Sequence, residues 1–595
     1  MDRGGPATVT TVSFHFHGYQ PGDIVRWRET DPLKPQTFDG RRSPVSHRVG
    51  SERISGDNWT DAVLRTYGRL QSVLERSAGA ASVDIEPQTL EWLLERDPEA
   101  HRRILASYER GTAALAMTPP FHPILPHHHA FEREVLFEMM IDFHASLLRT
   151  IPEGSVGVWL PEAAYSRDVL DSYGVAARRA AVEHDCLPDL VDGVHLLLDV
   201  RQFAGATTPR QAWGRFEPGS RMSAVGRDPS LSGDFAFGAS DASTFCAAVG
   251  SRAAEALLVA SDLESLLANP TQAERFEAIV AGLRGQGTEV GAPRPPKDSP
   301  PVGLVDFSSW SDYEDTMHRG HTSDTRWTGL RRADGVIVSR FHRDVKVSQL
   351  WKHAFTLATE RVETAVRRTS ANVLRNLGVL RPKETLRRLS LAYARHLFRG
   401  HYRACGLSSA DVDFGRAAET ILRGKVDLDI AGLFTRGYIL MLMGLRSDPR
   451  FWDNPDTRVT FQNVALLAQS LVDISEACSR AGDAERTDRV LRLLRATLLE
   501  FSDAYARADF ATLRGAEGWE SLEPAWYHSL QSEVPDRSGY DVVRRATLFA
   551  VGGRLSEKLP EFRGRREEIV ADTGHIVGEA HGDWEQKAWC EHRVG

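Results

Sequence analysis

The chain has 595 residues, of which 42% are hydrophobic, and its formal net charge at pH 7 is −8. This length allows two or three domains with full cores, and the mildly acidic balance lacks the clustered basic face of a nucleic-acid-binding protein. The sequence shows no signal-peptide pattern, no apolar run of the roughly 18 residues that span a membrane, and five scattered cysteines without metal-ligand spacing, so a reducing cytoplasmic location is expected.

Residues 9–330 alternate short apolar or β-branched runs with segments of helical spacing. Strands are predicted at residues 9–16, 81–85, 113–117, 156–160, 256–260 and 302–307, and helices at 59–77, 88–95 and 131–150. A long polar connection rich in Gly, Pro and Ser occupies residues 26–58. Strands that alternate with helices predict an α/β fold with a mainly parallel sheet, either open or closed.

The pattern changes near residue 340, after which a 3.6-residue period dominates. Helices are predicted at residues 345–377, 383–401, 417–444, 463–481 and 487–507. A polar, arginine-rich stretch at residues 326–343 precedes the first of them. The sequence therefore predicts two domains, residues 1–336 and an all-helical bundle over residues 337–595 that packs on the first.

The most informative stretch surrounds Glu162. An apolar run ends at Pro161, and Glu162 follows directly, with Trp159 and Tyr165 nearby. Proline has no backbone N–H to donate, so it ends the strand and leaves Glu162 at the strand's carboxyl end. In a parallel barrel catalytic side chains collect there, and a carboxylate among aromatic rings suits a sugar-cleaving nucleophile. A glutamate that caps a strand-to-helix turn is the plainer alternative.

Three histidines are further candidates. His15 and His17 lie on one face of a predicted strand, since side chains alternate along a strand. They could bind a metal ion, donate hydrogen bonds to sugar hydroxyls, or be satisfied core residues. His122 follows another predicted strand, whereas the histidine run at residues 127–129 is typical of a solvated loop.

Carboxylates also end two other predicted strands. The run at residues 256–260 is followed by Asp262 and Glu264, and the run at residues 81–85 contains Asp84 and is followed by Glu86. Asp and Ser are good helix N-caps, and the helix dipole favours Glu in the first turn. Asp262 and Glu264 therefore predict either an active-site pair or the start of a helix.

Together these segments resemble glycoside hydrolase family 57. The family has a His-x-His motif followed by Gln-Pro near its N-terminus, which His15, His17, Gln20 and Pro21 match, best in a branch whose segment reads His-x-His-x-Tyr-Gln-Pro. The segments at residues 26–27, 87–93, 124–126 and 308–310 also have counterparts there.

The resemblance assigns the two reacting carboxyls. The family's nucleophile is the Glu of a Trp-x-Pro-Glu segment, which is Glu162 here, and its acid/base is the Asp of an Asp-x-Glu segment, which is Asp262. The residues expected to bind substrate are His15, His17, Gln20, Trp27, His122, Trp159, Glu264 and Trp310.

The resemblance also implies a fold and an activity. The fold is an incomplete (β/α)7 barrel followed by an all-helical C-terminal domain. The activity is that of a retaining hydrolase or glucanotransferase on α-glucans or related α-glycosides. No metal or other cofactor is needed. The expected partners are an oligo- or polysaccharide and, as an option, further copies of the chain in a homo-oligomer, with no nucleic acid and no membrane.

Two other functions stay open. In a metal-dependent carbohydrate deacetylase or metallohydrolase, His15, His17 and an Asp would hold a divalent ion that activates water. A catalytically degenerate, glucan-binding protein is the other alternative. It is suggested by Ser265-Leu266-Leu267, which stands where the family usually has Phe-Gly-His.

Overall fold

The computed structural model describes residues 11–20, 66–310 and 350–494, apart from short internal gaps, and four short strands between residues 25 and 54. Of these, β2 (Val25–Arg26) pairs with β3 (Thr37–Phe38), and β4 (His47–Val49) pairs with β5 (Glu52–Ile54). Trp27, the predicted boundary at residue 336 and the end of the last predicted helix lie outside the described residues. The chain divides into two compact units, the first with the large sheet and the second with the helices after residue 350.

Seven parallel strands form a closed ring in the first unit. In ring order they are β1 (Thr11–Gly18), β6 (Ala81–Ile85), β7 (Ala114–Met117), β8 (Val156–Trp159), β9 (Val194–Asp199), β11 (Ser223–Arg227) and β12 (Ala256–Asp262), which pairs with β1. Pairing is thinnest between β11 and β12, where a single aligned pair joins Arg227 and Leu258. β10 (Trp213–Arg215) is antiparallel to β11, and β13 (Glu289–Gly291) is parallel to β1. The predicted seven-stranded β/α barrel is therefore confirmed.

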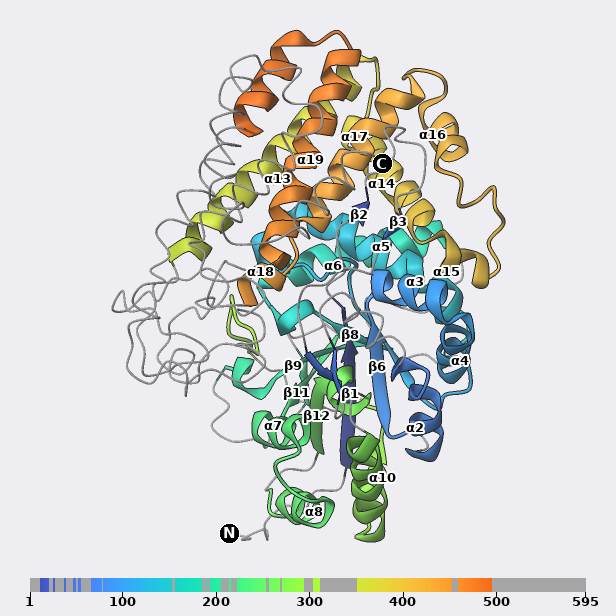
Figure 1. Ribbon diagram of the computed structural model, residues 1–595, viewed down its shortest axis with the longest axis vertical. Helices are drawn as coiled ribbons and strands as arrows, with labels where there is room; N and C mark the ends of the chain where they lie inside the picture. Colours follow the sequence, from blue (N-terminus) through green and yellow to red (C-terminus); the bar gives the residue numbers. More distant parts are fainter. Residues whose placement is uncertain are drawn as a thin grey trace. The chain divides into compact units, whose positions relative to one another are not determined.

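Helices follow the strands along the chain and surround the ring (Figure 1). They are α2 (Leu70–Ser77), α3 (Pro87–Arg96), α4 (Pro98–Glu109), α5 (Ala130–Leu148), α6 (Arg167–Glu183), α7 (Pro229–Phe237), α8 (Ala242–Gly250), α9 (Leu263–Leu267) and α10 (Pro270–Gly285), with the 3-10 turns η2 (Leu125–His127), η3 (Pro161–Ala163) and η4 (Val200–Gln202). Side-chain caps start several of them. Asp97, Asp228 and Asp241 each accept a hydrogen bond from the backbone N–H three residues on.

Strand β1 shows how the barrel wall acquires one apolar and one polar face. Phe14 and Phe16 pack against Phe235 of α7 and Phe276 of α10, with ring centroids 5.0 to 5.7 Å apart. Since neighbouring side chains point to opposite faces, the alternate histidines of β1 face the interior of the barrel. Burial of the phenylalanines thus fixes the register that places polar groups inside.

The ring differs from the sequence prediction at three places. β9 and β11 were not predicted, and residues 302–307 are not the last barrel strand. In their described part, Leu304 forms only an isolated bridge with Phe203, and Phe307 has a left-handed φ of 52°, which interrupts extended backbone. The small residues of β11, Ser-Ala-Val-Gly-Arg, give little hydrophobic signal, which explains why that strand was missed.

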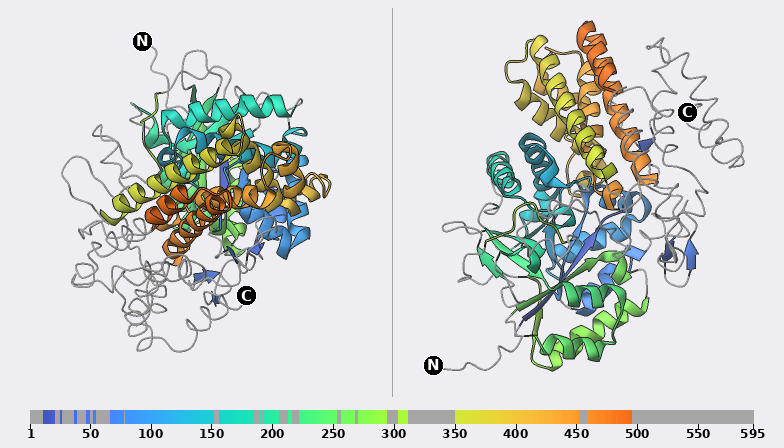
Figure 2. Two further views of the ribbon diagram at one scale, coloured as in Figure 1. Left: turned by 90° about the horizontal axis from the view of Figure 1, so that it is seen from above. Right: turned by 90° about the vertical axis from the view of Figure 1, so that its left-hand side faces the viewer.

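The second unit is helical from residue 350 to residue 494 wherever it is described, apart from turns and connections, as predicted (Figure 2). Its helices are α13 (Leu350–Asn376), α14 (Pro382–Leu397), α15 (Arg399–Ala404), α16 (Phe414–Leu422), α17 (Leu428–Met443), α18 (Asp448–Phe451), α19 (Arg458–Arg480) and residues 484–494. α17 packs closely on α19, where Arg436 and Asp473 form a buried two-pronged ion pair of 2.6 and 2.7 Å. None of the described helices combines the length and the apolar character that crossing a membrane requires.

Gly226 of β11 should be sensitive to any side chain. A Cβ atom there would overlap Phe203 Cε2 and lie 2.8 Å from Val200 Cγ1. Gly226→Ala should therefore lower the free energy of unfolding by about 1–3 kcal/mol through overpacking. Gly233→Ala in α7 is the matched control, because no atom lies within 4 Å of its Cβ position and alanine favours helix. Thermal unfolding checks this prediction, and equal midpoints for the two variants would contradict it.

Candidate active site

Every strand of the ring brings a polar side chain to the same end of the barrel. Five of these side chains lie near the carboxyl end of their own strand, and two follow their strand in the next turn. In ring order they are His17, Asp84, His122, Glu162, Asp199, Arg227 and Asp262. The carboxyl ends of the strands are where catalytic groups gather in parallel barrels, so this end holds the candidate active site.

Asp84 organises one side of this site. Its side chain is completely buried and lies between two histidines of β1. His15 Nε2 is 3.0 Å from Asp84 Oδ1, and His17 Nδ1 is 2.8 Å from Asp84 Oδ2. His17 Nε2 in turn lies 2.9 Å from His122 Nε2. The four side chains therefore form one connected polar cluster.

The electrostatics of this cluster fix where its protons lie. Burial lowers the pKa of His17, but the charge and hydrogen bond of Asp84 outweigh burial and raise the pKa to about 9. At neutral pH both ring nitrogens of His17 thus carry protons, so that Nδ1 donates to Asp84 and Nε2 donates to His122. His122 accepts on Nε2 and is therefore the neutral partner. Burial is the main cause that lowers the pKa of His15, so His15 is neutral as well.

The turn that carries His122 is strained and firmly held. Phe121 and His122 both have left-handed backbone, with φ of 70° and 48°. The buried carboxylate of Glu86 accepts the backbone N–H of Phe121 at 2.8 Å, and the Tyr19 ring stacks on His122 with a centroid distance of 4.0 Å. Left-handed backbone at non-glycine residues persists where the surroundings fix it, and it is common at functional sites.

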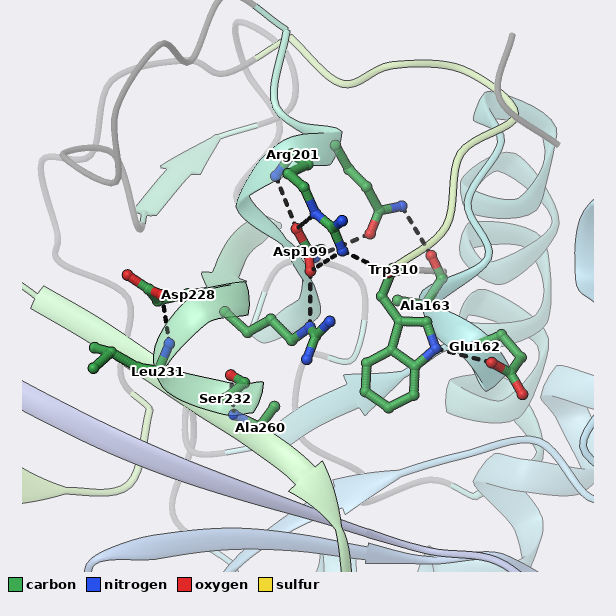
Figure 3. Close-up of polar contacts among 11 residues, drawn as sticks. Glu162, Ala163, Asp199, Arg201, Asp228, Leu231, Ser232, Ala260 and Trp310 are labelled. Carbon is green, nitrogen blue, oxygen red and sulfur yellow. Dashed lines mark hydrogen bonds and ion pairs between the residues drawn. The ribbon is translucent and has the colours of Figure 1, made fainter. Parts of the chain in front are cut away.

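Glu162 lies in the turn η3 with an equally unusual backbone. Its φ is 59°, and its side chain is 8% exposed. The Trp310 indole N–H donates to Glu162 Oε2 at 2.8 Å, and the Trp310 backbone N–H donates to the Glu162 carbonyl oxygen at 3.3 Å (Figure 3). The following helix α6 has Ser166 as its N-cap, so Glu162 does not cap that helix.

Asp262 is the last residue of β12, and its carboxyl interacts with the charge of Glu162. Solvent reaches the Asp262 side chain, but the protein on its other sides still desolvates the carboxyl. This desolvation is the largest cause that raises the pKa of Asp262; the charge of His17 opposes the rise, and the negative charge of Glu162 adds to it. The two carboxyls are therefore close enough for their charges to interact.

Glu264 lies two residues further on, in the first turn of α9. Tyr67 donates its hydroxyl proton to Glu264 Oε1 at 2.8 Å, and the Gln20 side-chain amide donates to the same oxygen at 2.5 Å. Burial and the charge of Asp262 raise the pKa of Glu264 to about 7. Gln20 is itself fixed by its backbone N–H, which donates to Thr89 Oγ1 at 3.0 Å.

Most of the residues expected from the sequence meet at this end of the barrel, but two of them are inaccessible. His15 and Trp159 have no exposed surface. The Trp159 ring packs on the two histidines, with ring centroids 5.0 Å from that of His15 and 5.3 Å from that of His17. A side chain without exposed surface cannot touch a sugar in this conformation. The expected substrate contacts of His15 and Trp159 therefore stay predictions that would require a different conformation of the site.

Several site residues were not among the candidates. Asp84 was noted only as part of a strand end, although, like Glu162, it is a carboxylate at the carboxyl end of a predicted strand. Asp199 and Arg227 end strands β9 and β11, which the sequence pattern did not reveal. Tyr67 contributes its hydroxyl from beyond the strands, and no local signal marks it.

The described residues contain no group of three or more His, Cys, Asp or Glu side chains arranged to hold a metal ion. The ring nitrogens of His15 and His17 face Ser82, Asp84 and His122. Both histidines are thus engaged in contacts within the protein, and charged His17 forms an ion pair with Asp84.

Comparisons with known proteins agree with this architecture. Two family models cover most of the chain: the N-terminal domain of maltose-forming alpha-amylase-like proteins matches residues 9–322, and the C-terminal domain matches residues 326–574. The comparison with curated protein sequences finds no match.

The chain also resembles solved structures to different degrees. The exo-type maltose-forming amylase from Pyrococcus sp. ST04 is 32% identical, with 95% of this chain and 94% of that chain covered and a TM-score of 0.76. The 4-alpha-glucanotransferase from Thermococcus litoralis is 13% identical, with coverages of 79% and 58%, and the branching enzyme from Thermococcus kodakaraensis is 10% identical, with coverages of 83% and 95%; both have TM-scores of 0.40. From the two family models and the Pyrococcus structure, the chain belongs to the maltose-forming alpha-amylase-like family.

Proposed function

We propose that this protein is a retaining glycoside hydrolase or glucanotransferase of family 57 that acts on α-glucans. The observation that carries the proposal is the pair Glu162 and Asp262, two interacting carboxyls with different surroundings at the carboxyl end of the barrel. The Pyrococcus relative, 32% identical over nearly the whole chain, is an exo-type maltose-forming amylase, which supports a starch-type α-glucan as substrate.

The two carboxyls divide the chemistry of retention between them. Glu162 attacks the anomeric carbon, while protonated Asp262 gives its proton to the leaving glycosidic oxygen. This forms a covalent glycosyl-enzyme ester on Glu162 and leaves Asp262 ionised. Asp262 then removes a proton from water or from an acceptor hydroxyl, which displaces Glu162 from the anomeric carbon. Two inversions restore the original configuration.

The surroundings match this division of roles. A general acid must hold a proton at neutral pH, and desolvation together with Glu162 raises the pKa of Asp262 in that direction. Glu162 accepts the indole N–H of Trp310, and this hydrogen bond holds its side chain in one orientation. Glu264 receives two donors on one oxygen and is fixed by them, which suits a residue that binds a sugar hydroxyl.

Azide should distinguish the two roles. Azide can occupy the space of a removed carboxylate and attack the anomeric carbon itself. With an α-glycosyl fluoride, Glu162→Ala should lose activity by at least about 1000-fold, because covalent catalysis has no substitute group, and azide should restore turnover as the β-glycosyl azide. Asp262→Ala should instead yield the α-glycosyl azide, because Glu162 still reacts first.

Glu264→Ala is the matched control for these variants. It removes a neighbouring carboxyl that the proposal places in substrate binding, so azide should restore nothing and form no glycosyl azide. Product configuration is read by proton NMR. An α-azide from Glu162→Ala, or a β-azide from Asp262→Ala, would contradict the assignment.

The pH profile of kcat/KM should report the proton on Asp262. Because the pKa of Asp262 is raised, activity that needs this proton is present below the raised pKa and falls as pH increases through it. The test uses a glycosyl fluoride, because its leaving group needs little protonation and the variant therefore keeps measurable activity. With this substrate, Asp262→Asn should lose the alkaline limb of the pH profile of kcat/KM. An unchanged alkaline limb in Asp262→Asn, together with its loss in Glu264→Gln, would transfer the acid role to Glu264.

A further inference from the structure

We propose that Trp310 is a positioning residue for the nucleophile: its indole N–H sets the orientation of the Glu162 carboxylate, and an ion-pair cluster of buried Asp199 with Arg201 and Arg227 holds the indole in place. This inference rests on the proposed function, because it takes Glu162 as the nucleophile. It gives Trp310 a role that differs from the substrate contact implied by the resemblance, in which the ring would stack on a sugar.

The contact with Glu162 is made through two parts of Trp310. The indole Nε1–H donates to Glu162 Oε2 at 2.8 Å, and the backbone N–H donates to the Glu162 carbonyl oxygen at 3.3 Å (Figure 3). The first bond fixes the rotation of the carboxylate, and the second fixes the turn from which it projects. A nucleophile held in one orientation needs less reorganisation before it attacks.

The indole ring is enclosed by two other side chains. The guanidinium of Arg227 lies over the ring, 4.6 Å from its centroid, and Trp159 packs against it edge-on at 4.9 Å. Arg201 Nη2 donates to the Trp310 carbonyl oxygen at 2.6 Å. The ring and the backbone of Trp310 are thus both anchored, and the direction of the indole N–H is fixed.

Asp199 aligns the two arginines (Figure 3). Its buried carboxylate accepts Arg201 Nε on Oδ1 at 2.8 Å and Arg227 Nε on Oδ2 at 2.8 Å. A carboxylate between two guanidinium groups fixes the plane of each and compensates their charge. Through these arginines, Asp199 at the end of β9 acts on the orientation of Glu162, which follows β8.

The segment that carries Trp310 is also joined to the nucleophile turn. Tyr165 and Ser308 exchange two backbone hydrogen bonds of 2.8 and 3.0 Å. The Gln202 side-chain amide bridges the Ala163 carbonyl oxygen at 2.9 Å and Ser308 Oγ at 3.1 Å. Because Glu162 and Ala163 hold left-handed backbone, these bonds stabilise a turn that would relax without them.

Trp310→Phe separates positioning from stacking, because it keeps an aromatic ring and removes only the N–H donor and the second ring. The readout is the rate at which 5-fluoro-α-glucosyl fluoride, or its maltosyl counterpart, labels Glu162 covalently, followed by mass spectrometry. Fluoride departs with little help from Asp262, so labelling isolates the attack by Glu162. We expect labelling about 10- to 100-fold slower, with inhibitor binding changed less than about threefold.

Trp92→Phe is the matched control, since Trp92 is a fully buried tryptophan in α3, outside the site. Its labelling rate should stay within about twofold of the wild-type rate. A purely structural loss in Trp310→Phe would weaken inhibitor binding together with labelling, whereas lost positioning of Glu162 slows labelling alone.

The outcomes separate the two levels of the proposal. If the wild-type protein takes the label on another residue, or takes none, the proposed function fails whatever Trp310 does. If the wild type labels Glu162 and Trp310→Phe labels it at an equal rate, the positioning role is overturned. Should Trp310→Phe not fold, Arg227→Met removes the guanidinium from the indole face. That variant should slow labelling about 3- to 10-fold, and an unchanged rate there would equally overturn the inference.

Discussion

Two completely buried carboxylates, Asp84 and Asp199, hold the carboxyl end of the barrel in its functional arrangement. A buried charge is costly unless it is compensated, and each of these carboxylates has a nitrogen partner at both oxygens. Asp84 contacts charged His17 and neutral His15 of β1, and Asp199 pairs with two arginines. These contacts determine which way the neighbouring polar side chains can point.

The two carboxyls that we propose to react lie within this framework, and each has its own neighbours. Glu162 accepts the indole N–H of Trp310, whose position depends on the pairs around Asp199. Asp262 lies opposite the charged His17 in the strand register, and His17 owes its charge to Asp84. His17 opposes the rise in the pKa of Asp262 that desolvation and Glu162 cause. The surroundings of both carboxyls thus depend on side chains outside the proposed reaction.

The sequence predicted the parts of this arrangement that local patterns encode. A proline directly before Glu162 marks a strand end, and the two-residue period of β1 places His15 and His17 on one face. Both features depend only on neighbours in the chain. The barrel itself was predictable because strands alternate with helices, and the helical second half because its 3.6-residue period is long and uninterrupted.

Other parts of the site depend on contacts that no local pattern contains. β11 is built from small residues, so Arg227 could not be recognised as a strand end. The hydrogen bond between Trp310 and Glu162 joins residues 148 positions apart, through a segment that looked like a strand and forms only isolated bridges. The buried surfaces of Trp159 and His15 follow from packing inside the ring, and an aromatic or histidine in a motif is equally compatible with substrate contact.

The central claim is that Glu162 forms an ester by one inversion at the anomeric carbon and that water or an acceptor displaces it by a second, so that the α configuration is retained. Proton NMR of the first-formed product from an α-glucan or α-maltosyl fluoride, recorded before mutarotation, tests this claim most directly. The account predicts that the α-anomer appears first and converts to the equilibrium mixture with time. First appearance of the β-anomer would contradict it, because a single displacement by water needs no nucleophilic Glu162.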